Sequence, residues 1–237
     1  MNIIEISSAH SQTFKTLLAI KKGESKDDLV IIEGNDLIEE AKRAKALKAT
    51  IAASREALVP AESSYIIPEF LISRLSNFKT PAKVLGIAKV TKTKTPGDNF
   101  IYLDGVQDPG NVGTIIRTAL CFGFSSVMIS PESASLTNSK VIQASKGAIF
   151  RIPVGVMDYR ELLATKAHLY LTLLEGKDER EFDHLEKPCG IVLGNEGQGI
   201  PKDHRAVGTP IRIAMGRFDS LNVAVAAAIF MYRFQSR

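Results

Sequence analysis

Three loops of this 237-residue chain concentrate residue types that bind ligands, and the first covers residues 108–119. It reads DPGNVGTIIRTA, with two glycines that allow a close backbone approach and with Asn111 placed to cap a helix. Arg117 then follows among the apolar residues of that helix. Because arginine keeps its charge, it must meet an anion or line a cleft in such a place. The loop therefore predicts a functional arginine near a helix start.

The second loop, residues 191–200, reads IVLGNEGQGI and follows a strand of the buried type. Its glycines invite comparison with a dinucleotide-binding fingerprint, but their spacing is G-x-x-G-x-G and no long helix follows. Glu196 stands at the apex. A carboxylate there disfavours a pyrophosphate and favours a neutral or cationic ligand group. A plain structural turn remains an equally good interpretation of the glycines alone.

The third loop leads into the last helix, expected at 221–234, and reads IAMGRFDSLNVAVAAA over residues 213–228. Ser220 is a good N-cap residue for that helix, which leaves Asn222 in the first turn as a hydrogen-bond donor and acceptor. Apolar residues cover more of the helix than one core-facing stripe requires. Packing within one subunit is one explanation, and a subunit interface with Ile229 or Phe230 facing outward is the other.

The elements that must position these loops follow an α/β pattern. The strands expected in the second part of the chain are 100–103, 127–130, 151–154, 168–173, 190–193 and 211–214, and the helices are 112–122, 139–146, 159–165 and 221–234. Alternation of this kind predicts a mostly parallel sheet covered on both faces. Ligands of such sheets bind beyond the carboxyl ends of the strands, where the three loops belong.

A smaller α/β module is expected over residues 1–90, followed by a linker at 91–98 and a second domain at 99–237. The module's expected helices are 11–22 and 35–47, and its strands are 29–33, 50–53, 65–67 and 84–90. Residues 1–96 hold 15 basic and 11 acidic residues, whereas the remainder holds 15 of each. The whole net charge of +4 therefore lies in the first part. Such a surface suits the phosphates of RNA, with a solvated lysine face as the alternative.

Composition excludes several classes of protein. No apolar run approaches the roughly 20 residues of a membrane span. The N-terminus lacks the basic lead of a secretory signal, and two cysteines fit a reducing cytoplasm better than a disulfide framework. The four histidines show no metal-ligand spacing with either cysteine, so no metal is expected. We expect a cytoplasmic protein without a membrane partner.

Taken together, the three loops resemble the signature motifs of the SpoU, or TrmH-like, RNA ribose 2′-O-methyltransferases of the SPOUT class. The residues that match the family pattern are Pro109, Asn111, Gly113, Arg117, Thr118 and Ala119 in the first motif, Gly194, Glu196, Gly197 and Gly199 in the second, and Ser220, Leu221, Asn222 and Val223 in the third. Residues 144–153 also look like the family's stretch between motifs. Departures are small, with Asp219, Ala224 and Ala214 where the family often has other residues.

The resemblance implies a C-terminal SPOUT α/β-knot domain with a deep trefoil knot, an N-terminal α/β L30e-like domain that binds the RNA substrate, and a homodimer through the knot domain. It also implies S-adenosyl-L-methionine as the cofactor. The cofactor-binding residues it implies are Gly194, Asn195, Glu196, Gly197, Ile213, Met215, Ser220, Leu221 and Asn222. The catalytic residues it implies are Arg117, Asn111, Glu196, Ser220 and Asn222. A cationic sulfonium cofactor without phosphate agrees with a glycine loop that carries a carboxylate.

The expected reaction is methyl transfer to a ribose 2′-hydroxyl in structured RNA. The L30e-like module favours ribosomal RNA, with transfer RNA or a non-catalytic RNA-binding relative as alternatives, and a nicotinamide-dependent reductase as a rival with the wrong glycine spacing. By the family pattern Arg117 activates the hydroxyl, in its own or in the partner subunit's site. Since a guanidinium holds its proton, orienting the hydroxyl and stabilising the alkoxide is easier for it than general-base catalysis.

Overall fold

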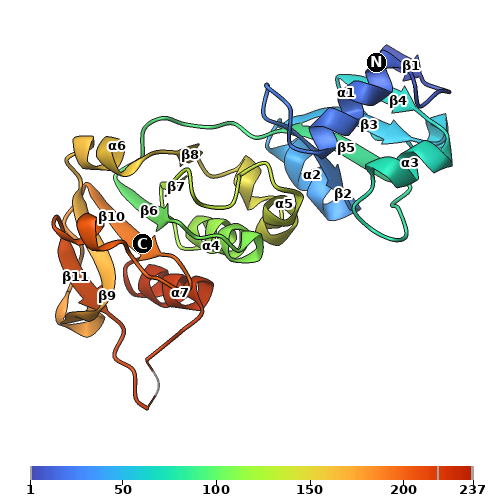
Figure 1. Cartoon of the computed structure of the whole chain (residues 1–237). Coiled ribbons are helices and arrows are strands. Elements are labelled where there is room, and N and C mark those ends of the chain that lie inside the picture. The colour runs from blue at the N-terminus through green and yellow to red at the C-terminus, as the bar shows by residue number, and fades with distance from the viewer. Residues whose placement is uncertain (1, 218, 236–237) are drawn as a thin grey trace.

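In the computed structural model, which covers residues 2–217 and 219–235, the chain forms two sheets joined by one connecting segment (Figure 1). The first sheet takes five strands from residues 2–89, and the second takes six strands from residues 99–212. The two halves lie next to each other, with α2 and β2 of the first facing α5 of the second (Figure 1).

The N-terminal sheet is mixed, with the strand order β1-β4-β3-β5-β2. Its elements are β1 (Asn2–Glu5), α1 (Gln12–Lys21), β2 (Leu29–Glu33), α2 (Asn35–Arg43), β3 (Leu47–Ala52), η1 (Arg55–Ala57), β4 (Ser63–Ile66), α3 (Glu69–Leu75) and β5 (Val84–Lys89). Alternate strand residues face opposite ways. In β2, Ile31 packs in a core with Phe14 of α1 and Leu71 of α3, whereas Ile32 packs in the core that contains Leu37 of α2.

The C-terminal sheet is parallel at every pairing, with the order β11-β9-β10-β6-β7-β8. Its strands are β6 (Asn99–Asp104), β7 (Ser126–Ile129), β8 (Val154–Val156), β9 (His168–Asp178), β10 (Cys189–Gly194) and β11 (Thr209–Arg212). The helical elements are α4 (Pro109–Cys121), α5 (Ser139–Ser145), η2 (Ala148–Phe150), α6 (Tyr159–Ala164), η3 (Glu179–Glu181), η4 (Lys202–Arg205) and α7 (Val223–Arg233).

Both faces of this second sheet are buried. In β6, Ile101 lies in the core that α4 and α7 cover, whereas Phe100 lies in a core with Leu162 of α6. The predicted α/β class with a mostly parallel, doubly covered sheet is confirmed. Gly113 of α4 is needed for this packing, because a Cβ there would lie 2.5 Å from the carbonyl oxygen of Val141 in α5.

One hydrophobic cluster is shared by the two halves, in addition to a separate core in each half. The cluster that holds Ile115 of α4 and Phe230 of α7 continues to Ile32 of β2 and Leu37 of α2. Polar contacts reinforce the junction, since the side-chain amide of Gln143 donates to the backbone carbonyl of Glu33 at 3.1 Å. The N-terminal half is therefore held against the helices that follow the first loop.

Several sequence-based expectations were wrong in detail. The strand expected at 151–154 begins only at Val154, because η2 and a turn occupy the residues before it. The helix expected at 35–47 ends at Arg43, where Lys45 adopts a left-handed φ of 56° and the Ala46 N–H donates to the carbonyl of Ala41, a helix-ending arrangement. Strand β1 and helix α3 were not expected.

Candidate active site

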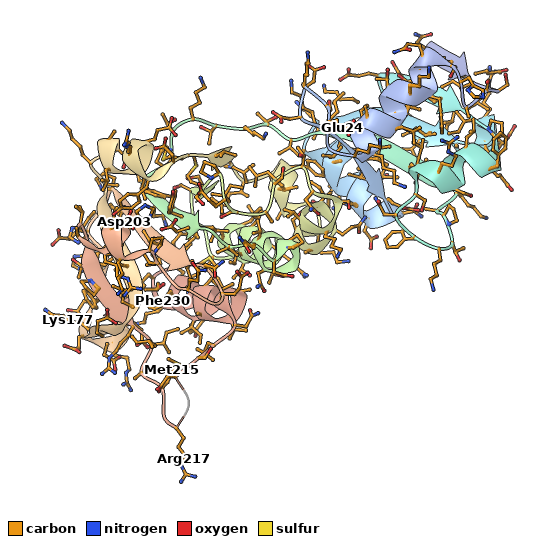
Figure 2. All side chains as sticks on the ribbon, in the orientation of Figure 1. Glu24, Lys177, Asp203, Met215, Arg217 and Phe230 are labelled. Atoms are coloured by element: carbon orange, nitrogen blue, oxygen red, sulfur yellow. The ribbon has the colours of Figure 1, made fainter. Side chains whose placement is uncertain are left out.

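A cavity of about 250 Å³ opens at the carboxyl ends of β10 and β11, beside the middle of β9. The sequence places the ligand site at this edge of the sheet. The cavity floor is apolar and includes Leu193, Val223 and Phe230, all of which are buried. Two carboxylates, those of Glu196 and Asp219, line it as well. Figure 2 shows Met215 at the base of the loop that follows β11, and Arg217 at the far end of this loop, pointing away from the body of the protein.

The second loop makes a tight turn along one wall of this cavity. Asn195 and Gly199 exchange backbone hydrogen bonds, and the Asn195 side chain accepts from the N–H groups of Gly197 and Gln198. The same side chain donates to the carbonyl of Gly105 after β6, at 2.8 Å. Position 194 requires glycine, because a Cβ there would lie 2.2 Å from backbone atoms across the turn.

A hydrogen-bond network joins one residue from each of the three loops. Glu196 accepts from the backbone N–H groups of Gln107 and Asp108 and from the side-chain amide of Asn111, at 3.1–3.2 Å. Asn222 donates in turn to the Asn111 side-chain oxygen at 3.0 Å. These two bonds thus bring together, beside the cavity, residues that are 85 and 111 positions apart in the sequence.

The ionisation of Glu196 follows from these bonds. Partial burial raises the pKa of its carboxyl, but the hydrogen bond from Asn111 and those from backbone N–H groups outweigh burial and bring the pKa below its ordinary value. Glu196 is therefore anionic at neutral pH. An anion at the edge of a cavity with an apolar floor suits a ligand with a positive or hydrogen-donating group.

Two helix caps differ from those that the sequence suggested. The side chain of Asp108, not that of Asn111, caps α4 by accepting from the Asn111 N–H at 2.8 Å. Asn222, not Ser220, caps α7 by accepting from the N–H groups of Ala224 and Val225. Asparagine and aspartate cap as well as serine, so only the position of the chain decides between neighbours. Ser220 instead lines the cavity.

A buried acid and a histidine anchor the segment that follows the second loop. Nδ1 of His204 in η4 lies 2.7 Å from a carboxylate oxygen of Asp104, which ends β6 and is 4% exposed. The ring of Tyr159 stacks on the His204 ring with 3.7 Å between centroids. Burial raises the pKa of Asp104, and the bond to His204 partly offsets this. No local sequence pattern predicts this pair, because its two residues are 100 positions apart in the chain.

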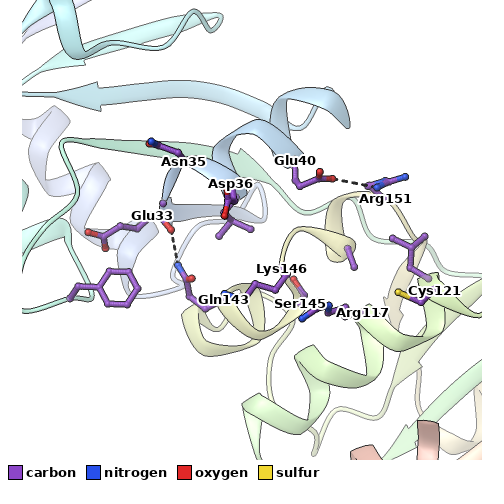
Figure 3. A pocket seen from close by; sticks show the side chains of 15 residues that line it. Glu33, Asn35, Asp36, Glu40, Arg117, Cys121, Gln143, Ser145, Lys146 and Arg151 are labelled. Atoms are coloured by element: carbon purple, nitrogen blue, oxygen red, sulfur yellow. Dashed lines mark hydrogen bonds and ion pairs between the residues drawn. The ribbon is translucent and has the colours of Figure 1, made fainter. Parts of the chain in front are cut away.

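Arg117 lies apart from the network. Its side chain is exposed and lines a second cavity, of about 730 Å³, between the two halves (Figure 3). Arg117 follows Asn111 by six positions on α4. This step corresponds to about 9 Å along the helix axis and to a rotation of about 120° around it. Within residues 2–217 and 219–235, no hydrogen bond or ion pair holds its guanidinium. The sequence places Arg117 among the apolar residues of this helix, but its side chain lies on the exposed side of α4 and lines a cavity.

The residues implied as cofactor contacts divide into two groups. Seven line the 250 Å³ cavity, namely Gly194, Asn195, Glu196, Ile213, Met215, Ser220 and Leu221. Gly197 and Asn222 do not line it. The N–H of Gly197 donates to Asn195 within the second loop, and Asn222 caps α7. Sequence reasoning missed Thr172, Leu173 and Leu174 of β9, which also line it. Part of the signal was available, since a strand was expected to end at residue 173 and ligands of parallel sheets bind beyond strand ends.

The outer surface of α7 also departs from expectation. Phe230 is 2% exposed and forms part of the cavity floor, so the idea that it faces outward was wrong. Val225 and Tyr232 are the exposed apolar side chains of this helix, at 48% and 66%. Tyr232 also meets the ring of Phe122 edge-on, with 5.9 Å between centroids. An apolar strip thus remains uncovered on α7.

Among the described residues, no group of three or more His, Cys, Asp or Glu side chains is arranged to hold a metal ion. Cys121 and Cys189 are both free thiols. None of the helices in the described part of the chain is long and apolar enough to span a membrane.

Comparison with known proteins settles the family. The model of the SpoU rRNA Methylase family matches residues 98–232, which include all three loops. The chain belongs to this family. A SpoU relative from Bacillus subtilis, 23S rRNA (guanosine(2553)-2′-O)-methyltransferase RlmP, is 31% identical over 98% of this chain and 99% of its own length. The predicted family and enzyme class are confirmed.

Solved structures of SpoU-type proteins match both halves of the chain. An AdoMet-bound rRNA methyltransferase from Sinorhizobium meliloti has a TM-score of 0.83 and 27% identity, with 98% of this chain and 97% of that one covered. A TrmH-family RNA methyltransferase structure from Porphyromonas gingivalis has a TM-score of 0.82 and 29% identity, with 96% and 99% covered. The α/β fold class with a mostly parallel sheet is confirmed, and the trefoil knot and the L30e-like fold of the N-terminal domain stay predictions.

Proposed function

We propose that this protein transfers a methyl group from S-adenosyl-L-methionine to a ribose 2′-hydroxyl in 23S ribosomal RNA. The observation that carries the proposal is the meeting of Asn111, Glu196 and Asn222 beside a cavity at the carboxyl edge of the sheet. Relatives that share both halves of the chain, and that are named as 23S rRNA 2′-O-methyltransferases or AdoMet-bound rRNA methyltransferases, support it.

The 250 Å³ cavity suits this cofactor by the chemistry of its walls. Leu193, Val223 and Phe230 offer apolar contact to an adenine ring, and the backbone of the second loop offers polar groups at its edge. The anionic side chain of Glu196 favours a ligand with positive charge. When bound there, the cofactor supplies an activated methyl on a sulfonium, which is already a good leaving group. The protein's task is then positioning.

The remaining task is to activate the nucleophile, which is the ribose 2′-hydroxyl. We assign this task to Arg117. A ribose hydroxyl is barely ionised at neutral pH, so a cation orients it and stabilises the developing alkoxide while the hydroxyl proton passes to solvent water. The Arg117 guanidinium is exposed to a cavity large enough for a nucleotide and holds no partner among the described residues. A planar fork of donors can hold an oxygen in a way that the point charge of lysine does not reproduce.

We also propose a homodimer in which Arg117 of one subunit serves the cofactor of the other. Arg117 faces away from the cofactor cavity of its own chain, and α7 leaves Val225 and Tyr232 exposed. Mixing Arg117→Ala with Gly194→Ala protein tests this, because a mixed dimer retains one intact composite site. Recovery of methyl transfer on mixing supports the shared site. If the two variants exchange subunits and methyl transfer does not recover, the shared site is contradicted.

For the domain arrangement, we propose that residues 1–90 form an L30e-like substrate-binding domain, that 91–98 connect it, and that 99–237 form the methyltransferase domain. The separate sheets and the positive charge of the first part support this division. A cytoplasmic location is proposed with it, because the proposed substrate, ribosomal RNA, is abundant there.

The decisive experiment maps methylation in RNA. Protein-free 23S rRNA from a strain that lacks this gene is incubated with the purified protein and methyl-labelled S-adenosylmethionine. Labelled 2′-O-methyl at one nucleotide, absent with Arg117→Ala and with Arg117→Lys, is the expected result. No label in the 23S rRNA would contradict the proposed function.

A further inference from the structure

The 730 Å³ cavity between the two halves has walls of different chemistry. The C-terminal half contributes Arg117, Lys146 and Arg151, and the N-terminal half contributes Phe78 and the acidic side chains of α2. Glu40 of α2 pairs with Arg151 at 3.4 Å, which leaves Arg117 and Lys146 as the cations of this wall without an ion pair among the described residues. Figure 3 shows Arg117 and Lys146 on one side of the space and the acidic residues of α2 on the other. The volume falls within the roughly 300–1,000 Å³ of ligand-binding pockets.

Phe78 presents an aromatic ring to solvent. It is 51% exposed, although its loop is firmly held. The carboxylate of Glu33, a residue 3% exposed, accepts from the hydroxyl of Ser76 at 2.8 and 2.9 Å and from the N–H groups of Asn77 and Ala82 at 3.2 and 2.8 Å. A buried carboxylate with these partners is satisfied, and removing it would release the loop at both ends.

Glu33 also fixes the loop relative to the other half of the protein. Its backbone carbonyl accepts from the side-chain amide of Gln143 in α5, which is the contact drawn in Figure 3. One residue therefore holds both the loop that carries Phe78 and the helix at the opposite wall. The loop that carries Phe78 is therefore anchored to the half that carries Arg117, and both residues line the same cavity.

Lys146 occupies a backbone conformation that favours glycine. It ends α5 with a φ of 49°, in the left-handed region, and its side chain is exposed at the cavity wall. A lysine is strained there relative to glycine, the usual residue at this place after a helix. Its side chain adds a cation to the cavity wall, and replacing it by glycine would relieve the backbone strain.

We propose that this cavity binds the RNA segment that carries the methylated ribose, with Phe78 stacking on a base of that segment and Lys146 holding a phosphate. The inference rests on the proposed function. Single-stranded RNA combines π faces with phosphates, and proteins bind it with aromatic platforms beside basic residues. The arrangement leaves the sugar between the two walls, on the side of Arg117.

Substitutions at Phe78 test the stacking, with protein-free 23S rRNA from the deletion strain as the probe and labelled methyl incorporation as the assay. We expect Phe78→Ala and Phe78→Leu to raise KM for the RNA by roughly 5- to 150-fold, the equivalent of about 1–3 kcal/mol of base stacking. Phe78→Tyr should keep KM near wild type, and in all three variants kcat and the Kd for S-adenosylmethionine should stay near wild type. Phe70→Ala is the matched control, because Phe70 is 60% exposed but does not line this cavity.

Lys146→Gly separates binding from folding. This variant should unfold at the wild-type temperature or above it, because the backbone strain is relieved. It should bind the RNA more weakly, and the slope of the logarithm of its affinity against the logarithm of the salt concentration should fall by about one phosphate contact. A KM within twofold of wild type for either Phe78→Ala or Phe78→Leu would overturn the stacking assignment while wild-type methylation stands. A wild-type protein that leaves 23S rRNA unmethylated would instead overturn the proposed function.

Discussion

Asn222 performs two tasks that can be separated by substitution. Its side-chain oxygen accepts from the N–H groups of Ala224 and Val225 at 2.9 and 3.3 Å, which caps α7, and its amide donates to Asn111 at 3.0 Å. Asn222→Ala removes both tasks. Asn222→Asp keeps an excellent cap but loses the donor.

The magnitudes follow from the separate bonds. Loss of the cap in Asn222→Ala should lower the free energy of unfolding by about 0.5–2 kcal/mol, or the midpoint temperature by roughly 1–8 °C for a chain of this size. Asn222→Asp should unfold close to wild type. Asn111 cannot reverse its amide to compensate, since it would lose its bond to Glu196. Both variants should therefore raise the Kd for S-adenosylmethionine by roughly two- to tenfold, the equivalent of about 0.5–1.5 kcal/mol.

Scanning calorimetry and titration calorimetry with S-adenosylmethionine provide the two measurements. Ser220→Ala is the control for the cap, because Ser220 lines the cavity without capping α7, and its midpoint temperature should not change. A wild-type Kd for Asn222→Asp would refute the claim that the network shapes the cofactor site. An unchanged midpoint temperature for Asn222→Ala would refute the capping assignment.

Three further predictions concern Glu196, Gly194 and α7. Because the pKa of Glu196 is lowered, its ionised carboxylate stabilises the fold at pH values above 4.5, the ordinary pKa of glutamate. This stabilisation is lost as the pH falls and the carboxylate is protonated. Urea melts should therefore show Glu196→Gln less stable at neutral pH but equal in strong acid, and a constant difference would contradict this. Gly194→Ala should abolish cofactor binding by calorimetry, because its Cβ would meet backbone 2.2 Å away; retained affinity would show that the turn yields. Val225→Glu with Tyr232→Glu should give inactive monomers by light scattering, and active monomers would exclude the dimeric site.

The sequence predicted the elements of the second half well because their apolar runs report burial directly. It placed all three loops at one edge of a parallel sheet, and that edge holds the cavity. It chose the wrong caps, however, at positions where two good capping residues stand close together. The contact between Asn222 and Asn111 spans 111 residues, and no local pattern carries that information.

Arg117 illustrates a second limit. Its exposure was available from helical spacing, since Thr114, Arg117 and Cys121 share the exposed side of α4 opposite the buried Ile115 and Ile116. What it faces was not available. The neighbouring wall belongs to the N-terminal half, and its position depends on how two separately folded sheets pack through a shared core.

Helix α4 connects the two cavities, and this arrangement constrains how the reaction can proceed. Its first turn carries Asn111, which joins the network beside the cofactor cavity, and its third turn carries Arg117, which lines the cavity between the halves. Methyl transfer requires the hydroxyl to lie within about 3–3.5 Å of the methyl carbon while the activating cation contacts the same oxygen. One chain with Arg117 directed away from its own cofactor cavity does not meet both conditions. A second chain that packs on the exposed strip of α7 can supply the missing arginine, and it brings that arginine together with the RNA cavity that surrounds it.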